Sequence, residues 1–417
     1  MPTFMRCVKA HTMDKRKCLF PFTNLTVNPN GSAAPCCKYN LNKVDSNLEA
    51  YTLYNKNVEE LFHQPAMNNI RDQFLTGKEP EGCKACWDEE DSGITSMRQH
   101  RFNLAKWNRH KEKYVGRFED PQMITLDFKF SSLCNLKCRI CGPYCSSNWL
   151  KESLDTGEYH EHTIKIFSKY AERKFVNNEI NFEIFNKILP NLHIIEFYGG
   201  EPLMQPEHAK IMNILNSYPN VEQLNLELFY NINGTFYDES VIETWNKMGI
   251  VELNISLDDI EDRFEYQRYP AKWNDVLDNI KQYKENCNSN VKMHLYCTVS
   301  LYNIFYIDDL IKYNAENLKL PLRFNLLHWP ESMSIKHLPE FVKNIIKSKI
   351  ELLTVNELSY ISKGFGINEV VNFMMSSPGS NEELTKFFKT TETHDEYRNQ
   401  KFQETFLEYW ILLNERN

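Results

Sequence analysis

The sequence is poor in glycine and contains no long apolar run. It has 14 glycines among 417 residues, about half the average frequency, so each glycine-containing turn is informative. No stretch approaches the roughly 18 apolar residues that a membrane-spanning helix needs, and we therefore expect no membrane partner. The first residues also lack the apolar segment of a secretory signal, so we expect a cytoplasmic protein.

Neither sign of charge dominates. The 48 Lys and Arg residues stand against 56 Asp and Glu residues, which gives a formal net charge of −8. This acidic balance argues against avid, sequence-independent binding to nucleic acid. The composition, 42% apolar and 25% charged, is that of an ordinary globular protein, and the length predicts two or three domains.

The 12 cysteines are too few for a disulfide scaffold, but they are clustered. In a reducing compartment, clustered cysteines bind metal more often than they form disulfides. The sequence therefore predicts two metal or cluster sites. The two groups are Cys18, Cys36, Cys37, Cys83 and Cys86, and Cys134, Cys138, Cys141 and Cys145.

Strand-like runs alternate with helical segments from about residue 120 onward. This alternation predicts an α/β fold with a parallel sheet, and six units indicate a partial (β/α)6 TIM-like barrel rather than a full one. Several runs alternate apolar with polar residues, so we expect the polar face to line a lumen that holds a polar cofactor and substrate; solvated edge strands are the alternative. The runs are 123–130, 193–198, 224–231, 251–258, 291–300 and 322–327.

Three regions are expected from these patterns. Residues 1–115 form a cysteine-rich module, and residues 116–330 form the barrel, with a mostly helical insertion at about 150–190. Residues 331–417 have the spacing of amphipathic helices.

The strongest motif follows the first strand run and reads Cys134-Asn-Leu-Lys-Cys138-Arg-Ile-Cys141. Three thiolates at these spacings can bind three irons of a cubane cluster and leave the fourth iron open to a small molecule. Zinc is the alternative, although three cysteines are one short of the usual closed structural set. The second run is followed by Gly199-Gly200-Glu201-Pro202, and the fourth run ends with Ser256 and Asp258, whose spacing places both side chains on one face.

Over residues 122–330, half of the chain, this set of motifs resembles the radical S-adenosylmethionine (SAM) superfamily. The resemblance implies a 4Fe-4S cluster on Cys134, Cys138 and Cys141 with SAM at its open iron. It further implies reductive cleavage of SAM to a 5′-deoxyadenosyl radical that abstracts hydrogen from a substrate, with a flavodoxin- or ferredoxin-type electron donor. The residues that the resemblance implies for SAM binding are Ile140, Gly199, Gly200, Glu201, Asn231, Asn233, Ser256, Asp258, Arg268 and Ser300.

Cys145 allows a different interpretation of the same loop. With Cys145 as a fourth ligand, the loop would resemble the ferredoxin run C-x2-C-x2-C-x3-C-P, and the protein would be a non-catalytic electron carrier. The first spacing differs from that run, and Ser146 stands where the proline would follow. We therefore expect Cys145 to be a structural thiol.

The N-terminal cysteines have a pattern of their own. Cys18, Gly31 and Cys36 fit the opening C-x(9–15)-G-x4-C of the SPASM and twitch modules, with Asn30-Gly31 at a predicted hairpin turn, and Cys83-Lys-Ala-Cys86 supplies a second pair. The resemblance implies an auxiliary 4Fe-4S cluster on Cys18, Cys36, Cys83 and Cys86, although such modules normally follow the barrel. Zinc on the same four cysteines is the alternative, and the Gly-x4-Cys count favours Cys36 over Cys37.

Enzymes with these modules most often modify peptides or proteins, and the resemblance therefore implies such a substrate. A small carbohydrate or a nucleotide-derived metabolite is the alternative. Polar residues of the strand runs are candidate substrate contacts, and each of them could equally serve a structural polar network. They are Lys129, Glu227, His294, Tyr296, Arg323 and Asn325.

Overall fold

The structure is a computed structural model of the chain, and it describes residues 17–40, 51–91, 96–99, 109, 111–172, 182–362 and 366–414. The chain divides into two compact units. The first comprises Met1–Phe128 and Phe175–Glu196, and the second comprises Lys129–Lys174 and Phe197–Asn417. This division differs from the expected boundaries at 115 and 330, because the first strand run groups with the N-terminal residues.

The reason for this grouping is a strand pair in the first unit. Strand β1 (Asn24–Val27) pairs in parallel with β3 (Thr125–Phe128), and the Thr26 hydroxyl donates to Asp127 Oδ2 at 2.9 Å. The predicted hairpin is also present, since β1 pairs antiparallel with β2 (Ala33–Ala34). The helices of this unit are α1 (Phe20–Thr23), α2 (Val58–Phe62), α3 (Pro65–Leu75), α4 (Lys84–Asp91) and α9 (Phe185–Ile188).

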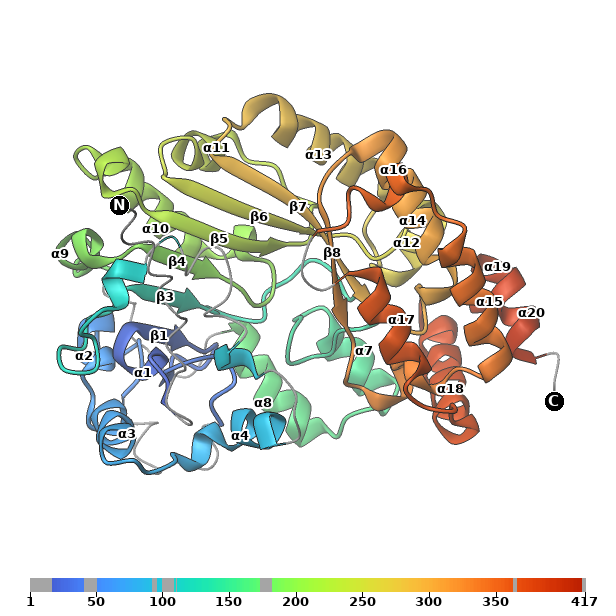
Figure 1. The fold of residues 1–417 in the computed structure, drawn as a ribbon, viewed down its shortest axis with the longest axis horizontal. Helices are drawn as coiled ribbons and strands as arrows, with labels where there is room; N and C mark the ends of the chain where they lie inside the picture. The colour runs from blue at the N-terminus through green and yellow to red at the C-terminus, as the bar shows by residue number, and fades with distance from the viewer. Residues whose placement is uncertain are drawn as a thin grey trace, which may run out of the picture. The chain divides into compact units, whose positions relative to one another are not determined.

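Four parallel strands form the sheet of the second unit, in the order β5-β6-β7-β8. Together with β3 and β4 (Ile194–Phe197), they account for all six predicted runs. Helices α11, α13 and α14 lie along the outside of these strands (Figure 1). The strands are β5 (Glu227–Ile232), β6 (Ile250–Ser256), β7 (Val291–Val299) and β8 (Leu322–Leu326). The helices are α10 (Pro206–Ser217), α11 (Glu239–Trp245), α12 (Glu261–Gln267), α13 (Trp273–Asn286) and α14 (Ile307–Tyr313).

Alternation along the strands sorts their side chains between two faces. Val251, Leu253 and Ile255 of β6 are each 0% exposed, and Leu295 and Cys297 of β7 are equally buried. These apolar side chains form the core beneath the helices. The fold is therefore α/β with a mostly parallel sheet, as the sequence predicts.

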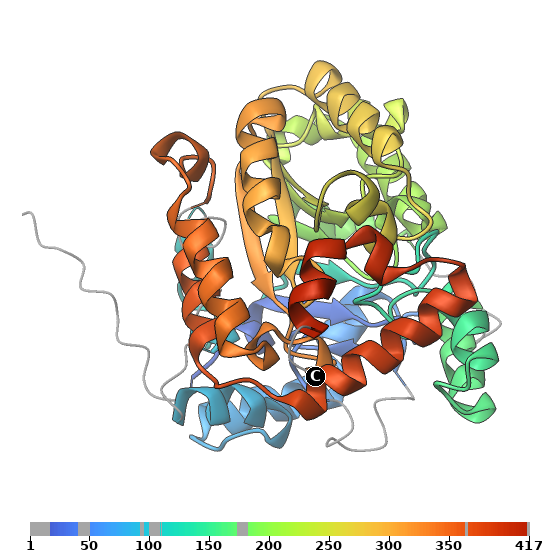
Figure 2. The ribbon, with the colours of Figure 1, turned by 90° about the vertical axis from the view of Figure 1, so that its right-hand side faces the viewer.

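The C-terminal region is helical, as expected. Ser380 caps α18 by accepting the backbone N–H of Glu383. The helix ends at Arg398 and is followed by Asn399, whose φ of 51° is left-handed. The insertion is helical in its described part, and Figure 2 shows it in green beside the end of α18. The helices are α7 (Trp149–Asp155) and α8 (Glu161–Glu172) of the insertion, then α15 (Glu340–Glu351), α16 (Val355–Leu358), α17 (Ile367–Met375), α18 (Asn381–Arg398), α19 (Phe402–Thr405) and α20 (Leu407–Asn414).

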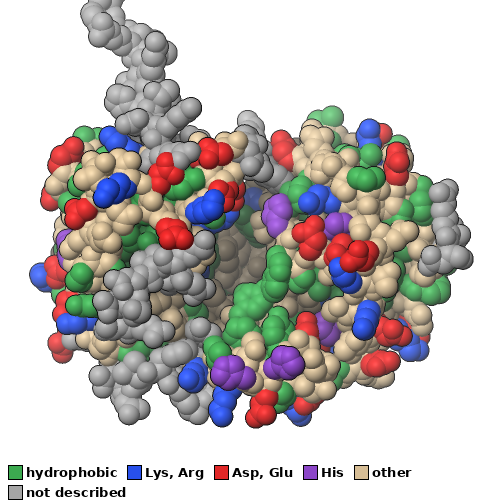
Figure 3. All heavy atoms as spheres, turned by 90° about the horizontal axis from the view of Figure 1, so that it is seen from below, with side chains coloured by type: hydrophobic (Ala, Val, Ile, Leu, Met, Phe, Trp, Pro, Cys, Tyr) green, Lys and Arg blue, Asp and Glu red, His purple; other side chains and the backbone are tan. Residues whose placement is uncertain are grey.

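The surface agrees with the modest net charge. On the face shown in Figure 3, acidic and basic side chains are interspersed rather than gathered by sign. In the part of the chain that the structure describes, no helix has both the length and the apolar character needed to cross a membrane.

Candidate functional site

The three-cysteine motif forms a loop after β3, and the backbone holds this loop in place. The N–H of Lys137 donates to the carbonyl of Tyr269 at 2.8 Å, and the N–H of Arg139 donates to the carbonyl of Gln267 at 2.8 Å. A tight turn closes the end of the motif, where the Cys141 N–H donates to the Cys138 carbonyl at 2.9 Å. These bonds attach the loop to the end of α12 and keep its thiols together.

The three thiols differ in their surroundings. A hydrogen bond from Cys141 lowers the pKa of Cys138 and raises that of Cys141, while burial raises the pKa of Cys134 to about 12. Two side-chain N–H groups approach the sulfurs: Asn233 Nδ2 lies 3.9 Å from Cys134 Sγ, and Arg268 Nη1 lies 3.9 Å from Cys138 Sγ. Such donors stabilise negative charge on sulfur, which is what a bound cluster requires.

The Gly-Gly-Glu turn packs directly against the cysteine loop. Gly199 and Gly200 have φ values of 75° and 53°. A Cβ on Gly200 would lie 2.2 Å from the carbonyl oxygen of Leu133, and that oxygen accepts the Glu201 N–H at 2.8 Å. Glycine is required here both by the backbone conformation and by the close approach.

Glu201 is buried and held by backbone donors. Its carboxylate accepts the N–H of Asn233 at 2.7 Å and that of Leu203 at 3.2 Å. Burial raises the pKa of Glu201 to about 7 against these two hydrogen bonds. The carboxylate thus links the end of β4 to the end of β5; a contact of Glu201 with SAM remains a prediction.

An asparagine network extends this link. Asn233 Nδ2 donates to Asn135 Oδ1 at 2.8 Å, and Asn135 Nδ2 donates to the hydroxyl of Thr235 at 2.9 Å. Asn231 Oδ1 accepts from Asn254 Nδ2 at 3.0 Å. The first two bonds connect the cysteine loop with the end of β5, and the third is a separate pair between β5 and β6.

Asp258 and Arg268 form a buried ion pair. Arg268 Nη2 lies 2.7 Å from Asp258 Oδ2, and Asp258 Oδ1 accepts the Thr298 N–H at 2.8 Å. Burial raises the pKa of Asp258, and Arg268 opposes that rise. Strand β6 ends at Ser256, two residues before Asp258, although the Leu257 N–H still donates to the Tyr296 carbonyl of β7 at 2.9 Å; a shared face of Ser256 and Asp258 remains a prediction.

Two other predicted SAM contacts have different positions. Ser300 is fully buried, and its hydroxyl accepts the Tyr302 N–H at 3.3 Å, so it holds the turn after β7. Ile140 is half-buried within the cysteine loop. Their roles toward SAM remain predictions.

The candidate substrate contacts do not lie together. Glu227 is the first residue of β5, whereas the cysteine loop and the Gly-Gly-Glu turn follow strand ends, so Glu227 lies at the opposite end of the parallel strands. This position argues against a contact of Glu227 beside the cysteine loop, and its role toward substrate stays a prediction. His294 and Arg323 do meet, with 3.2 Å between His294 Nε2 and Arg323 Nη2, and burial beside this cation lowers the pKa of His294 to about 4.

The remaining candidates are spread along the polar face and the loop after β3. Burial raises the pKa of Tyr296, which is opposite Ser256 in the strand register. Asn325 is exposed on β8, and Lys129 immediately follows β3, where its Cβ would lie 3.2 Å from a Cβ on Gly199.

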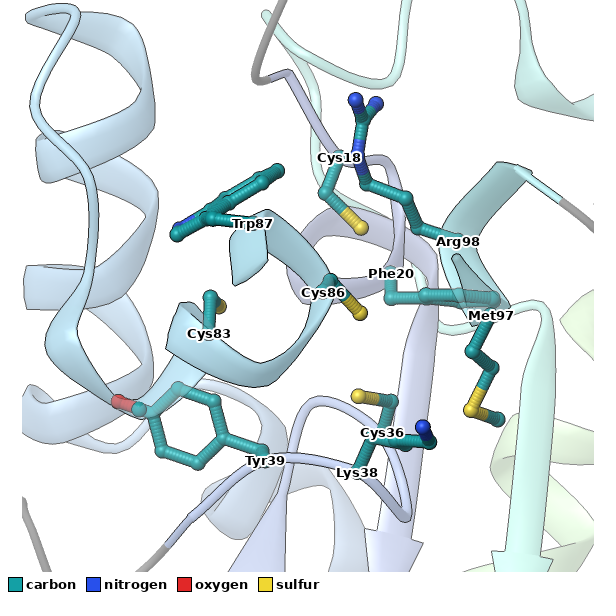
Figure 4. A pocket seen from close by; sticks show the side chains of 11 residues that line it. Cys18, Phe20, Cys36, Lys38, Tyr39, Cys83, Cys86, Trp87, Met97 and Arg98 are labelled. Carbon is teal, nitrogen blue, oxygen red and sulfur yellow. The ribbon is translucent and has the colours of Figure 1, made fainter. Parts of the chain in front are cut away.

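The N-terminal cysteines converge on one pocket of the first unit. Figure 4 shows the thiols of Cys18, Cys36, Cys83 and Cys86 pointing into the same space, which Trp87, Phe20, Tyr39, Met97 and Arg98 also line. Cys18 lies before α1 and Cys36 follows β2, while Cys83 ends the short 3-10 helix Glu81–Cys83 and Cys86 lies in the first turn of α4. Burial raises the pKa of Cys18 and of Cys83, and the neighbouring thiols raise it further.

The structure distinguishes Cys36 from Cys37. Cys36 lines the pocket, whereas Cys37 is exposed and its sulfur lies 3.7 Å from Met97 Sδ. Arg98 supplies positive charge beside the thiols, lowers the pKa of Cys18 and donates its backbone N–H to Cys86. Its guanidinium is held by Glu90 in a two-pronged ion pair.

Both sites have the donor set of an iron–sulfur cluster. Among the described residues, no group of three or more His, Cys, Asp or Glu side chains is arranged to hold a single metal ion. The all-cysteine sets fit clusters: three thiols on one loop would leave one iron open, and four thiols around one pocket would close a cluster.

Sequence reasoning missed three residues that build the barrel site. Asn135 and Arg139 form side-chain hydrogen bonds that hold the loop, and Asn254 donates to Asn231 on the neighbouring strand of the polar face. Asn135 and Arg139 lie inside the cysteine motif, so a closer examination of the polar residues between the cysteines could have found them. Asn254 could also have been found, because it is one of the polar residues in the alternating run 251–258.

Each of the two cysteine sets lies in a segment that matches a known protein family. Residues 128–312 match the model of the radical SAM superfamily, and residues 18–87 match SPASM, an iron–sulfur cluster-binding domain. The chain therefore contains a radical SAM domain, preceded by a SPASM domain. These domains imply SAM and 4Fe-4S clusters as cofactors, which confirms the cofactor prediction and the unusual N-terminal placement.

Relatives are distant. A GTP 3′,8-cyclase of Listeria welshimeri is 24% identical over 233 residues, which cover 55% of this chain and 61% of that protein. A GTP 3′,8-cyclase of Listeria monocytogenes matches with the same identity and coverage. The chain thus matches about three fifths of the length of these curated relatives.

Two solved structures also match. The SAM-bound structure of anSMEcpe is 19% identical, with a TM-score of 0.37 and coverage of 54% of this chain and 60% of that one. Streptococcus suis SuiB bound to S-adenosylmethionine is 12% identical, with a TM-score of 0.35 and coverage of 78% and 68%.

Proposed function

We propose that the chain is a radical SAM enzyme that modifies a peptide or a protein. The observation that carries the proposal is the presence, in one chain, of the three-cysteine loop and of a SPASM domain whose four thiols line one pocket. Enzymes with SPASM or twitch modules, which the sequence resembles, act most often on peptides and proteins. The electron donor would be of the flavodoxin or ferredoxin type.

Cys134, Cys138 and Cys141 would hold the cluster that binds SAM. When bound, this cluster supplies the electron that cleaves SAM to a 5′-deoxyadenosyl radical, which then takes a hydrogen atom from the substrate. The chain's own contribution is orientation and charge. Arg268 and Asn233 direct N–H groups at two of the three sulfurs, and the Gly-Gly-Glu turn presses against the loop that carries them.

The polar face of strands β6, β7 and β8 offers both hydrogen-bond donors and hydrogen-bond acceptors. Arg323 lies 3.5 Å from Glu252 and 3.2 Å from His294, whose lowered pKa keeps it neutral at pH 7. A peptide needs such mixed partners for its N–H and C=O groups. Glu252 offsets the charge of Arg323, and this arrangement suits a peptide better than a polyanion such as a nucleoside triphosphate.

A nucleotide substrate is the second candidate. The two Listeria relatives are GTP 3′,8-cyclases, and the match to each covers 61% of its length. Arg323 and Lys129 would be the cations available to a phosphate. The opposing charge of Glu252 makes this the weaker of the two proposals.

The decisive experiment measures products. Anaerobically reconstituted protein is incubated with SAM and dithionite, and 5′-deoxyadenosine is quantified by liquid chromatography. Formation of 5′-deoxyadenosine supports the enzyme proposal, and its absence from fully cluster-loaded protein would favour an electron carrier. GTP is added in a parallel reaction. If GTP is converted to a new nucleotide, the nucleotide proposal replaces the peptide proposal; if GTP stays unchanged, the peptide proposal is supported.

A further inference from the structure

Arg139 lies between Cys138 and Cys141 in the cysteine loop, and its side chain contacts residues outside the loop. The guanidinium is 0% exposed and lies 3.8 Å from the ring centroid of Tyr266. It forms an ion pair with Asp395, and Nη2 also donates to Gln400 Oε1 at 2.9 Å. A fully buried charge of this kind depends strongly on its partner.

Asp395 belongs to the last turn of α18, which is 256 residues further along the chain. Other groups fix its carboxylate as well. The Tyr266 hydroxyl donates to Oδ1 at 2.7 Å, and the Phe402 N–H donates to Oδ2 at 2.6 Å. The carboxylate is thus held rigidly where the Arg139 guanidinium must lie.

A second ion-pair path connects the same loop with the same helix. Lys137 Nζ lies 2.6 Å from Glu152 Oε2, and Glu152 Oε1 accepts from Arg398 Nε at 2.8 Å. Arg398 is the last residue of α18. The residues on both sides of Cys138 are therefore connected to this one helix.

We propose that helix α18 positions the cysteine loop, with Asp395 as the positioning residue that acts through Arg139. The backbone N–H of Arg139 donates to the carbonyl of Gln267, so a displaced guanidinium would also pull on the backbone beside Cys138. Without its counter-charge, the guanidinium must reach water, and it can do so only if the loop or the helix moves. The inference rests on the proposed function only in the one experiment that measures a bound cluster.

The first test uses the protein without clusters. Hydrogen exchange is followed by mass spectrometry in the Asp395→Asn variant and in Glu396→Gln, a matched control at the next, exposed position of α18. We expect the peptide containing residues 134–141 to exchange about tenfold faster in Asp395→Asn and at the unchanged rate in the control, because breaking a buried ion pair lowers local stability. Unchanged exchange in Asp395→Asn overturns the proposal.

A second variant separates positioning from general loss of stability. In Arg139→Met/Asp395→Leu no buried charge is left uncompensated, so the fold is expected to survive with a thermal midpoint near that of the wild type. Fast exchange at residues 134–141 in this well-folded double variant supports the proposal. If the loop exchanges in it at the wild-type rate, the ion pair does not position the loop, and the proposal is wrong.

The third readout is the reduction potential of the barrel cluster, measured by redox titration with electron paramagnetic resonance. Asp395→Glu, which keeps the charge, should retain the wild-type potential and spectrum, whereas the double variant should shift those of the barrel cluster and leave the auxiliary cluster unchanged. Identical spectra in all variants would overturn the proposal. A wild-type protein that forms no barrel cluster would instead refute the proposed function, and the exchange experiment would still decide the inference.

Discussion

The two cysteine sites of this chain are built in different ways. The barrel site takes its three thiols from one loop of eight residues, Cys134 to Cys141, and surrounds them with side chains from the end of β5 and the end of α12. The N-terminal site collects four thiols from segments up to 68 residues apart, Cys18 to Cys86. It encloses them with aromatic rings and with the Arg98 guanidinium.

The number of thiols at each site determines whether a bound cluster has an open iron. A cluster that binds SAM needs an open iron, and three ligands on one loop leave one side free for the Gly-Gly-Glu turn and the strand ends. An auxiliary cluster with four ligands is closed by protein, and burial raises the pKa of Cys18, Cys83 and Cys86 alike. The comparison indicates one reactive site and one enclosed site.

The largest expected effect comes from removing one ligand at each site. Cys138→Ala should lose about four irons and all SAM cleavage, because the loop can no longer hold a cubane. Cys83→Ala should also lose about four irons but should still cleave SAM to 5′-deoxyadenosine. Iron analysis and chromatography measure both outcomes. Loss of SAM cleavage in both variants would show that the two sites are not independent.

A glycine substitution tests the packing around the open site. Gly200→Ala should lower the free energy of unfolding by more than about 3 kcal/mol, because it combines a left-handed φ with a Cβ placed 2.2 Å from the Leu133 oxygen. Gly157 is the matched control in the same unit, since its φ is 71° with nothing within 4 Å of the added Cβ. Gly157→Ala should cost only about 1–2 kcal/mol in denaturant unfolding. Equal costs would contradict the close packing.

The raised pKa of Glu201 predicts that stability depends on pH in the acidic to neutral range. Between its ordinary pKa of 4.5 and the folded value of about 7, the unfolded chain releases a proton that the folded chain keeps. Stability of the cluster-free protein should therefore fall as pH rises through this range, by up to about 3 kcal/mol.

Glu201→Gln should remove this part of the pH dependence, while Glu222→Gln, at an exposed position, should leave it intact. Urea unfolding of both variants at several pH values provides the measurement. Burial also raises the pKa of Asp259 to about 7, so part of the slope should remain in both variants. A slope in Glu201→Gln as steep as that of the wild type would contradict the assignment to Glu201.

The smallest effects should come from the cysteines that flank the two sites. Cys37 and Cys145 are both exposed, so Cys37→Ala and Cys145→Ala should retain all iron and change stability by less than about 0.5 kcal/mol. If Cys145→Ala loses the barrel cluster, the site is closed by four ligands, as in a ferredoxin.

The sequence was most informative where chemistry is local. The cysteine spacing, the Gly-Gly-Glu turn and the strand alternation each lie within a few residues, and the structure has strands at all six predicted runs. Alternation along the chain could not show where each strand begins and ends, or at which end of a strand a given side chain lies. Asp258 lies beyond β6 rather than on it, and Glu227 begins β5 at the end opposite the loop.

Spacing and residue type by themselves determined the α/β fold, the two cysteine sets and the resemblance that the family models confirm, because thiol ligation and backbone periodicity act over short stretches of chain. Only the tertiary structure decided that Cys36 rather than Cys37 lines the pocket, that Asp258 pairs with Arg268 and that Arg139 meets Asp395. Buried charges must be neutralised by groups that folding brings near, and a partner 256 residues away has no signature in the local sequence.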